Sequence, residues 1–201
     1  MPFHASRPHD DHVRVLLSGL RDAPFTYPEV GLTREGPPRA PAGFVLDDYG
    51  TELGRGPEVL ARARAALLRF AHYPPSFTRV VRLGDTMQPR ALFATVAQHF
   101  GFSSTHPCRV VYVIDEPGRF GFGFGTLPGH SERGEERFVV RTDALGRVSY
   151  DVRAFSRPAG LVTRMGGVLA RRLQRRFQRE TVAEMRRLCA ADEAKRGHGE
   201  P

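Results

Sequence analysis

The spacing of hydrophobic residues changes along the chain near residue 77. Before that point, apolar residues recur at steps of three and four, the period of a helix with one buried face. This spacing predicts a helix over residues 57–70, because Pro57 suits a first helical turn and Pro74-Pro75 stops the chain from continuing. Its buried stripe consists of Val59, Leu60, Ala63, Leu67 and Phe70. A shorter helix, capped by His9 or Asp10, is predicted over residues 9–21.

After residue 77, apolar and polar residues alternate, which is typical of half-buried β-strands. The six stretches with this pattern are residues 78–84, 90–97, 108–116, 119–127, 135–143 and 147–155. Residues 44–50 form a seventh predicted strand. Because the turns between consecutive strands are short, we expect an antiparallel meander.

Helical spacing returns near the C-terminus and predicts a long amphipathic helix that begins as early as Ala159, with residues 168–190 as its main part. Its apolar side carries Val162, Met165, Leu169, Leu173, Phe177 and Leu188. Its basic side carries Arg164, Arg171, Arg175, Arg179 and Arg186. A half-apolar sheet needs a cover, and this helix can supply it.

These elements predict one α+β domain over residues 1–201, with a curved antiparallel sheet of about seven strands wrapped on the long C-terminal helix. We expect an N-terminal extension over about 1–24, a core over 25–190 and a flexible tail over 191–201. The element order resembles the helix-grip fold of the START and Bet v 1-like superfamily. That resemblance implies a ligand cavity between the sheet and the helix.

The charge and cysteine content adds little about function. The net charge is +8, but 29 of the 30 basic residues are arginine, which is consistent with a GC-rich coding bias. Cys108 and Cys189 lie in different predicted elements, and the N-terminus lacks the pattern of a signal peptide. We therefore predict a cytoplasmic protein with reduced thiols. No apolar stretch is long enough to span a membrane.

One predicted strand, RFGFGFGTL (119–127), alternates phenylalanine with glycine. Phe120, Phe122 and Phe124 then share one face, and the three glycines share the other. The glycines allow either sheet curvature or a smooth floor beneath a ligand. The strand is not followed by a helix or a Gly-Lys-Ser/Thr motif, so no dinucleotide or phosphate loop is predicted and no cofactor is expected.

The next segment, TLPGHSERGEERF, places His130 close in sequence to Glu135 and Glu136. A histidine beside a carboxylate can transfer protons, which makes these three residues the catalytic candidates. The alternative is a surface loop in which a glutamate pairs with Arg157. No third ligand has diagnostic spacing, so we predict no metal site.

Three blocks together resemble an uncharacterised bacterial and plant family, a domain of unknown function: FTYPEVG (25–31), GFGFGTLPGHSERGEERF (121–138) and VSYDVRAFSRPAG (148–160). The resemblance implies an identity without an activity. The residues that it singles out are Tyr27, Glu29, Thr126, His130, Glu135, Glu136, Ser156 and Arg157. We expect polar side chains from these segments to meet at one end of the sheet, with Arg157 paired to Glu135 or Glu136.

Three functions fit these observations. The favoured one is a module that binds a small apolar molecule or lipid between the sheet and the C-terminal helix. Its predicted apolar lining consists of Phe122, Phe124, Tyr112, Phe138 and Tyr150, although such residues more often fill a core. The second is an enzyme that uses His130 with Glu135 or Glu136. The third is a binder of nucleic acid or anionic membrane through the arginine-rich helix, which we do not expect because no recognition motif is present.

Overall fold

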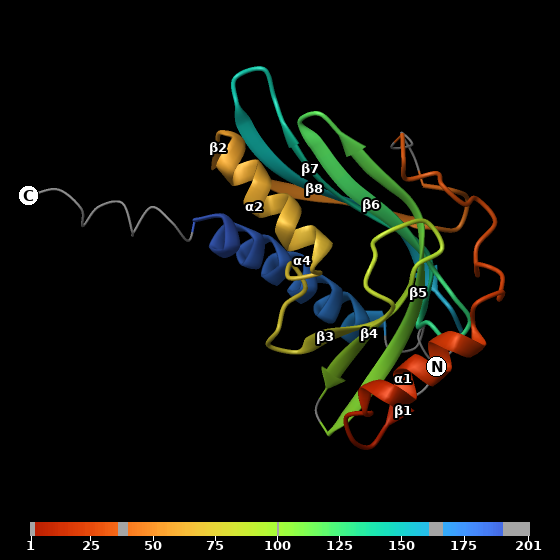
Figure 1. Ribbon diagram of the computed structural model, residues 1–201. Helices are drawn as coiled ribbons and strands as arrows, with labels where there is room; N and C mark the ends of the chain where they lie inside the picture. The colour runs from red at the N-terminus through yellow and green to blue at the C-terminus, as the bar shows by residue number, and fades with distance from the viewer. Residues whose placement is uncertain (1–2, 36–39, 100, 161–166, 191–201) are drawn as a thin grey trace, which may run out of the picture.

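A computed structural model describes residues 3–35, 40–99, 101–160 and 167–190. Its helices are α1 (Asp10–Gly19), α2 (Pro57–Leu68) and α4 (Gly167–Ala190). Its strands are β1 (Phe3–His4), β2 (Val45–Arg55), β3 (Thr78–Leu83), β4 (Leu92–His99), β5 (Phe102–Glu116), β6 (Arg119–Thr126), β7 (Glu132–Thr142) and β8 (Arg147–Pro158). Figure 1 shows their arrangement.

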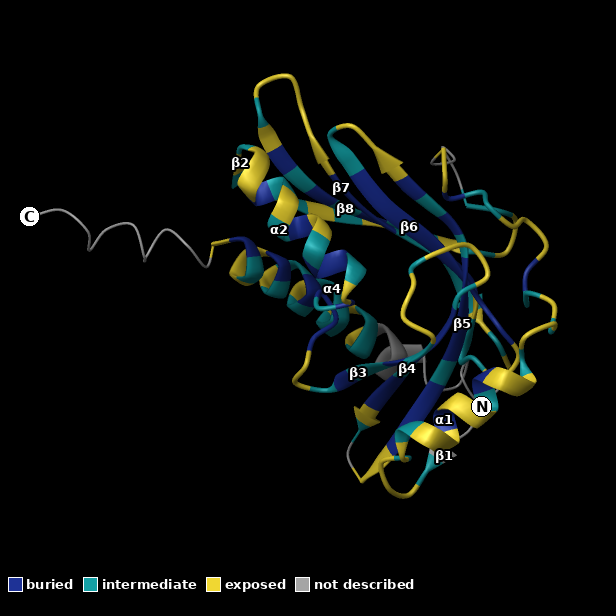
Figure 2. Cartoon of the chain, viewed as in Figure 1, coloured by how far each residue is buried: buried dark blue, intermediate teal, exposed yellow. Residues whose placement is uncertain are grey.

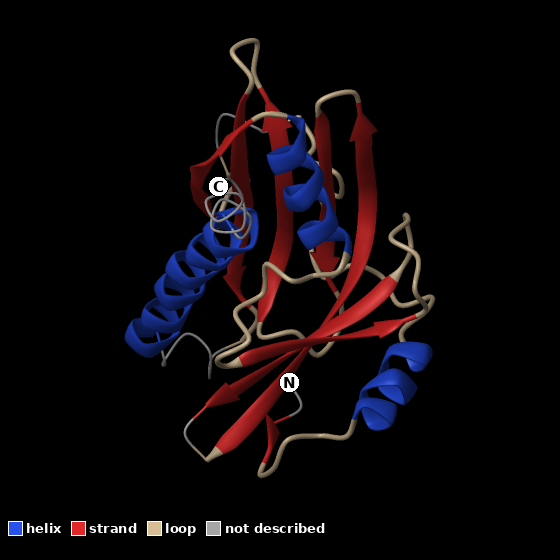
Figure 3. Cartoon of the chain, turned by 60° about the vertical axis from the view of Figure 1, so that its left-hand side comes forward, coloured by secondary structure: helices blue, strands red, loops and turns tan. Residues whose placement is uncertain are grey.

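All strands belong to one antiparallel sheet with the order β2-β8-β7-β6-β5-β4-β3, and β1 pairs with β5. Each of the strands β3 to β7 pairs with the next along the chain, which confirms the predicted meander. The sheet is strongly twisted and curves around two helices (Figure 3). The predicted α+β, helix-grip-like fold class is confirmed.

The inner face of the sheet, defined as the face covered by α2 and α4, holds the main core (Figure 1). Phe120, Phe122 and Phe124 all point to this face, as their spacing predicts. The Phe122 and Phe124 rings join Phe70, Phe93 and Phe138 in one aromatic cluster. Figure 2 shows the corresponding band of buried residues along β6.

The opposite, outer face is covered by α1 and by residues 25–34. Val13 and Leu17 of α1 are buried against Val81, Leu92 and Val96 of the sheet. The α1 helix begins after His9, whose imidazole accepts a hydrogen bond from the Asp11 backbone. The residues predicted as an N-terminal extension therefore include a helix that packs against the sheet.

Several element boundaries differ from the predictions. β5 begins at Phe102 instead of residue 108, because the polar run Ser103–His106 pairs with β4 despite its lack of apolar alternation. β2 extends to Arg55 through an irregularity between Glu52 and Gly54. On α4, the buried positions are Thr181, Met185 and Cys189. The predicted apolar residues Val162, Met165 and Leu169 and the tail 191–201 lie outside the described side chains.

Candidate functional site

Two consecutive glutamates on β7 face opposite sides of the sheet. Side chains alternate along a strand, and Phe138 of β7 points to the inner core. Glu136 therefore shares the inner face with Phe138, whereas Glu135 points to the outer face. The predicted catalytic candidates thus lie in two separate environments.

The Glu135 carboxylate is buried, with 2% exposure, and holds the segment 25–34 against the outer face. One oxygen accepts hydrogen bonds from the Tyr27 hydroxyl at 2.7 Å and the Gly31 backbone nitrogen at 2.6 Å. The other accepts from the Thr33 nitrogen at 2.9 Å and the Thr33 hydroxyl at 2.5 Å. The hydroxyls of Thr33 and Tyr112 are also hydrogen-bonded, at 2.7 Å. Burial and the Glu135 charge raise the pKa of Tyr27, so its hydroxyl stays a donor.

This network explains two of the glycines in β6. A Cβ atom built on Gly123 would lie 2.3 Å from the Tyr112 ring, and one on Gly125 would lie 2.1 Å from the Tyr27 hydroxyl. Both glycines therefore make room for the tyrosines that surround Glu135. The smooth-floor interpretation is wrong for Gly123 and Gly125, because tyrosine side chains already lie over them.

Glu136 has a different environment on the inner face. It pairs across the sheet with Phe124 on one side and with Ala154 on the other, and Ala154 in turn pairs with Asp47. Burial, followed by the charges of Glu132 and Asp47, raises the pKa of Glu136 to about 8. The carboxyl is therefore largely protonated at neutral pH. In the described part of the chain, it has no hydrogen-bond partner.

Tyr49 of β2 lies near Glu136 and also lacks a partner. Its hydroxyl is buried without a hydrogen bond to any described residue. Burial, together with the nearby Glu136 charge, raises the pKa of Tyr49 well above its ordinary value. Buried polar groups are almost always hydrogen-bonded, so the unpaired Tyr49 hydroxyl beside the half-buried Glu136 carboxyl needs an explanation.

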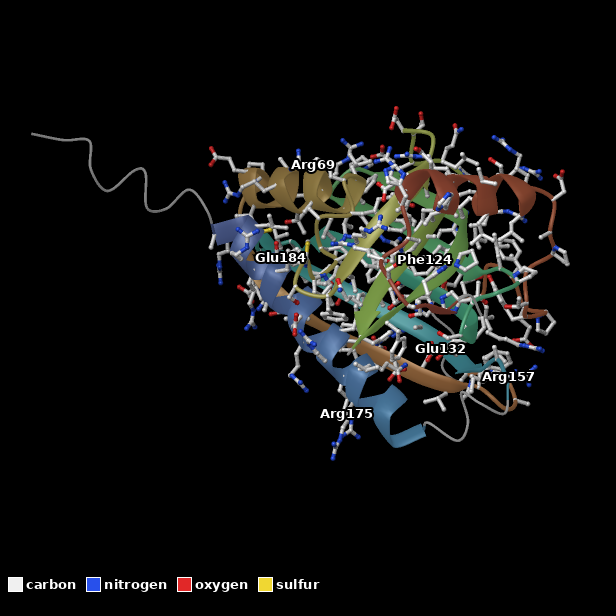
Figure 4. All side chains as sticks on the ribbon, turned by 90° about the horizontal axis from the view of Figure 1, so that it is seen from below. Arg69, Phe124, Glu132, Arg157, Arg175 and Glu184 are labelled. Atoms are coloured by element: carbon white, nitrogen blue, oxygen red, sulfur yellow. The ribbon has the colours of Figure 1, made fainter. Side chains whose placement is uncertain are left out.

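Other polar side chains surround this pair beneath α4. Gln174 and Gln178 of α4 donate hydrogen bonds to Asp47, at 3.0 and 3.2 Å. The Ser156 hydroxyl bonds the Glu132 carboxylate, whose pKa is raised mainly by burial. Figure 4 labels Glu132 on the sheet. We call Asp47, Tyr49, Glu132, Glu136, Ser156, Gln174 and Gln178 the inner polar cluster.

His130 does not form the predicted acid–base pair with a carboxylate. Its Nδ1 atom lies 2.9 Å from the backbone nitrogen of Glu132 and 3.1 Å from the Glu132 carbonyl oxygen, and its ring contacts His106. Burial lowers the pKa of His130 to about 4, and no carboxylate opposes that shift. His130 is therefore neutral and engaged with the backbone of its own turn.

The predicted ion pair of Arg157 is also absent from the described contacts. The Arg157 guanidinium lies over the Phe44 ring, 4.6 Å from its centroid, and Arg157 is placed at the periphery in Figure 4. Glu135 is already saturated by neutral donors, and Glu136 lies on the other face. The prediction of an Arg157 pair with either glutamate was wrong, because residues 25–34 already supply the hydrogen-bond donors to Glu135 and Glu136 points to the inner face.

The remaining candidates are divided between the faces. Thr126 ends β6, where its hydroxyl contacts the Thr26 hydroxyl at 2.5 Å and accepts from the Gly134 nitrogen at 3.0 Å. Phe122 and Phe124 lie within the inner aromatic cluster, with 0% and 6% exposure. Tyr112, predicted to line a cavity with them, instead lies on the outer face. Glu29 is exposed.

Sequence analysis did not single out several site residues. Thr33 lies beyond the recognised block 25–31. Asp47 and Tyr49 lie within the predicted strand 44–50, where no motif marked them as site residues. Alternation within FVLDDYG would have placed Asp47 and Tyr49 on the same face. Gln174 and Gln178 are four residues apart on α4, a spacing that puts both on one helix face.

Within the described residues, no group of three histidine, cysteine, aspartate or glutamate side chains is arranged to hold a metal ion. Cys108 and Cys189 are free and buried. No helix in the described ranges combines the length and apolar character needed to cross a bilayer.

Comparisons with known proteins identify relatives over most of the chain. A family model described as a domain of unknown function, DUF1990, matches residues 26–184. A UPF0548 protein of Deinococcus radiodurans is 34% identical over 182 residues, covering 86% of this chain and 91% of the relative. A UPF0548 protein of Arabidopsis thaliana is 28% identical over 145 residues, covering 69% and 70%.

Solved structures resemble the fold at low sequence identity. A hypothetical protein from Helicobacter pylori aligns with a TM-score of 0.52 and 12% identity, covering 84% of this chain and 98% of that protein. A protein from Thermus thermophilus aligns with a TM-score of 0.53 and 14% identity, covering 73% and 98%. At these identities the likeness concerns the fold alone.

Proposed function

The chain belongs to the DUF1990 family, and we propose that it is a binding module whose ligand lies between the inner face of the sheet and α4. The ligand would have an apolar body and a neutral hydrogen-bonding end, such as a hydroxyl or carbonyl group. The observation that carries this proposal is the buried Tyr49 hydroxyl, which has no hydrogen-bond partner among the described residues, beside the half-buried Glu136 carboxyl, whose pKa is raised to about 8.

The protonation state of Glu136 determines which ligand end group fits. A protonated carboxyl offers one donor and one acceptor, and a phenol hydroxyl offers the same. An anionic ligand would be repelled by Asp47 and Glu132, which lie close enough to raise the pKa of Glu136. The cluster therefore favours a neutral polar end over a charged one.

The apolar side of the proposed site lies next to the unpartnered pair. Phe124 pairs with Glu136 across the sheet, and Phe138 follows Glu136 by two residues on the same face. Phe177 of α4 packs against the same core and remains only partly buried. An apolar ligand body would extend the core toward the helix.

Mass spectrometry of molecules retained by the natively purified protein tests the proposal. We expect a neutral small molecule bound to the wild type and reduced retention by Tyr49→Phe and Glu136→Gln. Tyr112→Phe is the matched control, because it removes a tyrosine hydroxyl on the outer face and should leave retention unchanged. A wild-type protein that carries no small molecule, or equal loss in both tyrosine variants, would contradict the proposal.

A further inference from the structure

The outer face carries a charged recess that the inner site does not involve. It has a volume of about 450 Å³. Its lining residues are Arg34, Glu35, Asp48, Arg119, Arg137, Arg141, Asp151 and Arg153. Because every lining residue is charged and five of the eight are arginine, the recess is unsuited to an apolar ligand.

Strand register explains why a hollow forms among these arginines. Arg137 pairs with Arg153 across β7 and β8, and Arg119 pairs with Arg141 across β6 and β7. The cross-strand row between these two pairs runs through Gly50, Asp151, Val139 and Gly121. Both ends of this row are glycines, which contribute no side chains. The long arginine side chains therefore flank a row of shorter residues, which leaves a hollow between them.

Three of the arginines already have acidic partners. Arg153 pairs with Asp48, Arg141 pairs with Asp151 at 2.9 Å, and Arg119 pairs with Glu116 at 3.4 Å. Such ion pairs near the surface are worth little, about 0–1 kcal/mol each, so they can rearrange around a ligand.

Arg34 and Arg137 have no carboxylate partner among the described residues. The Arg137 side chain donates to the Arg34 carbonyl oxygen at 3.2 Å, but its Nε atom is buried without any hydrogen-bond acceptor. Burial lowers the pKa of Arg137. The charges of Arg153 and Arg119 act in the same direction, whereas Tyr112 and Asp151 oppose the shift. A bound anion would supply the missing acceptor and offset this repulsion.

We propose that this outer recess binds a small phosphate-bearing anion through Arg137 and Arg34. The planar guanidinium group donates parallel hydrogen bonds that match phosphate oxygens, and such charge-assisted bonds are stronger than neutral ones. A volume of about 450 Å³ lies within the usual range of small-molecule sites. Neither the charged recess nor Arg137 was identified from the sequence.

Isothermal titration of the full chain with inorganic pyrophosphate at low ionic strength tests the site. We expect saturable binding, and loss of one charge-assisted contact in Arg137→Gln should weaken it by about tenfold or more. Arg34→Gln gives a second variant, in a segment outside the sheet, in case Arg137→Gln folds poorly. Arg175→Gln is the charge-matched control, because Arg175 is exposed and points away from the sheet in Figure 4.

The outcomes separate the possibilities. Pyrophosphate binding that survives Arg175→Gln and Tyr49→Phe but weakens in Arg137→Gln or Arg34→Gln supports the outer site. Absence of saturable binding to the wild type overturns it, as does an equal loss in Arg175→Gln, which would indicate general charge attraction.

Discussion

The adjacent residues Glu135 and Glu136 lie on opposite faces of the sheet and differ in their hydrogen bonding. On the outer face, Glu135 is buried and receives four hydrogen bonds from three residues. On the inner face, Glu136 is surrounded by protein atoms, has carboxylates as neighbours and stays largely protonated at neutral pH. The same side chain is thus held as part of the structure in one case and left unsatisfied in the other.

This difference separates structural residues from ligand-binding candidates. A buried carboxylate with all its hydrogen bonds made has nothing left to offer a ligand, and its removal exposes the donors that it satisfied. A carboxyl without partners, such as that of Glu136, adds no hydrogen bond to the folded state and keeps its full hydrogen-bonding capacity. Because Gly134, Glu135 and Glu136 are consecutive, a short sequence block combines both roles.

The largest expected effect comes from Glu135→Ala. The substitution leaves the Tyr27 hydroxyl, the Gly31 nitrogen and the Thr33 groups without their acceptor, so we expect the free energy of unfolding to fall by about 3–5 kcal/mol. Urea denaturation measures this change. Hydrogen exchange should show faster exchange in residues 25–34, which lose their attachment to the sheet.

Glu136→Ala is the control for that measurement. It removes the same carboxyl from the next residue, where no partner is lost. Because the folded state holds the Glu136 proton more tightly than the unfolded state, the free energy of unfolding should not fall and should rise at neutral pH. Equal destabilisation by the two substitutions would show that the contrast between the faces is wrong.

The fold was largely predictable from the sequence because each helix and strand buries one face. The period of the hydrophobic residues therefore shows which kind of element each segment forms. The alternation of Phe120, Phe122 and Phe124 was sufficient to place their rings in the core. The run Ser103–His106 escaped detection because polar residues can pair in a sheet without any apolar alternation.

The candidate site was less predictable because it depends on contacts between distant segments. The motif residues Tyr27 and Glu135 do form a hydrogen bond, but they are 108 residues apart in the sequence. No local spacing rule predicts a contact over that separation. Arg157 was paired incorrectly with the glutamates because proximity in a motif does not reveal the competing donors of Tyr27 and Thr33. The pKa of Glu136 likewise reflects Asp47, which lies two strands away in the sheet.

A smaller effect is expected from Gly123→Ala on the outer face. The new methyl group would lie 2.3 Å from the Tyr112 ring, and overpacking of this kind costs about 1–3 kcal/mol. Thermal denaturation of Gly123→Ala, Tyr112→Ala and the double variant should reveal a coupling of at least about 1 kcal/mol. Gly19→Ala is the control, since no atom lies within 4 Å of its added methyl group. Additive effects at Gly123 and Tyr112 would mean that the ring does not require the glycine.

The last expected effect is a change in the pH dependence of stability caused by Glu136→Gln. The folded protein raises the pKa of Glu136 from 4.5 to about 8, so the folded state holds this proton more tightly than the unfolded state. Stability therefore falls as pH rises toward 8, by at most about 1.4 kcal/mol per pH unit. Below pH 6.5 the sign reverses, because burial lowers the pKa values of His72, His106 and His130 and the unfolded state then binds more protons.

Wild-type stability should consequently reach its maximum near pH 6.5, the ordinary pKa of histidine. In Glu136→Gln the decline between pH 6.5 and 8 should disappear, while the acidic decline caused by the histidines persists as an internal control. Urea midpoints measured at half-unit pH steps resolve the two sides of the curve. If the alkaline decline is unchanged in the variant, Glu136 is ionised in the folded protein at neutral pH. The inner face would then lack the protonated carboxyl that the proposed neutral ligand end is expected to bind.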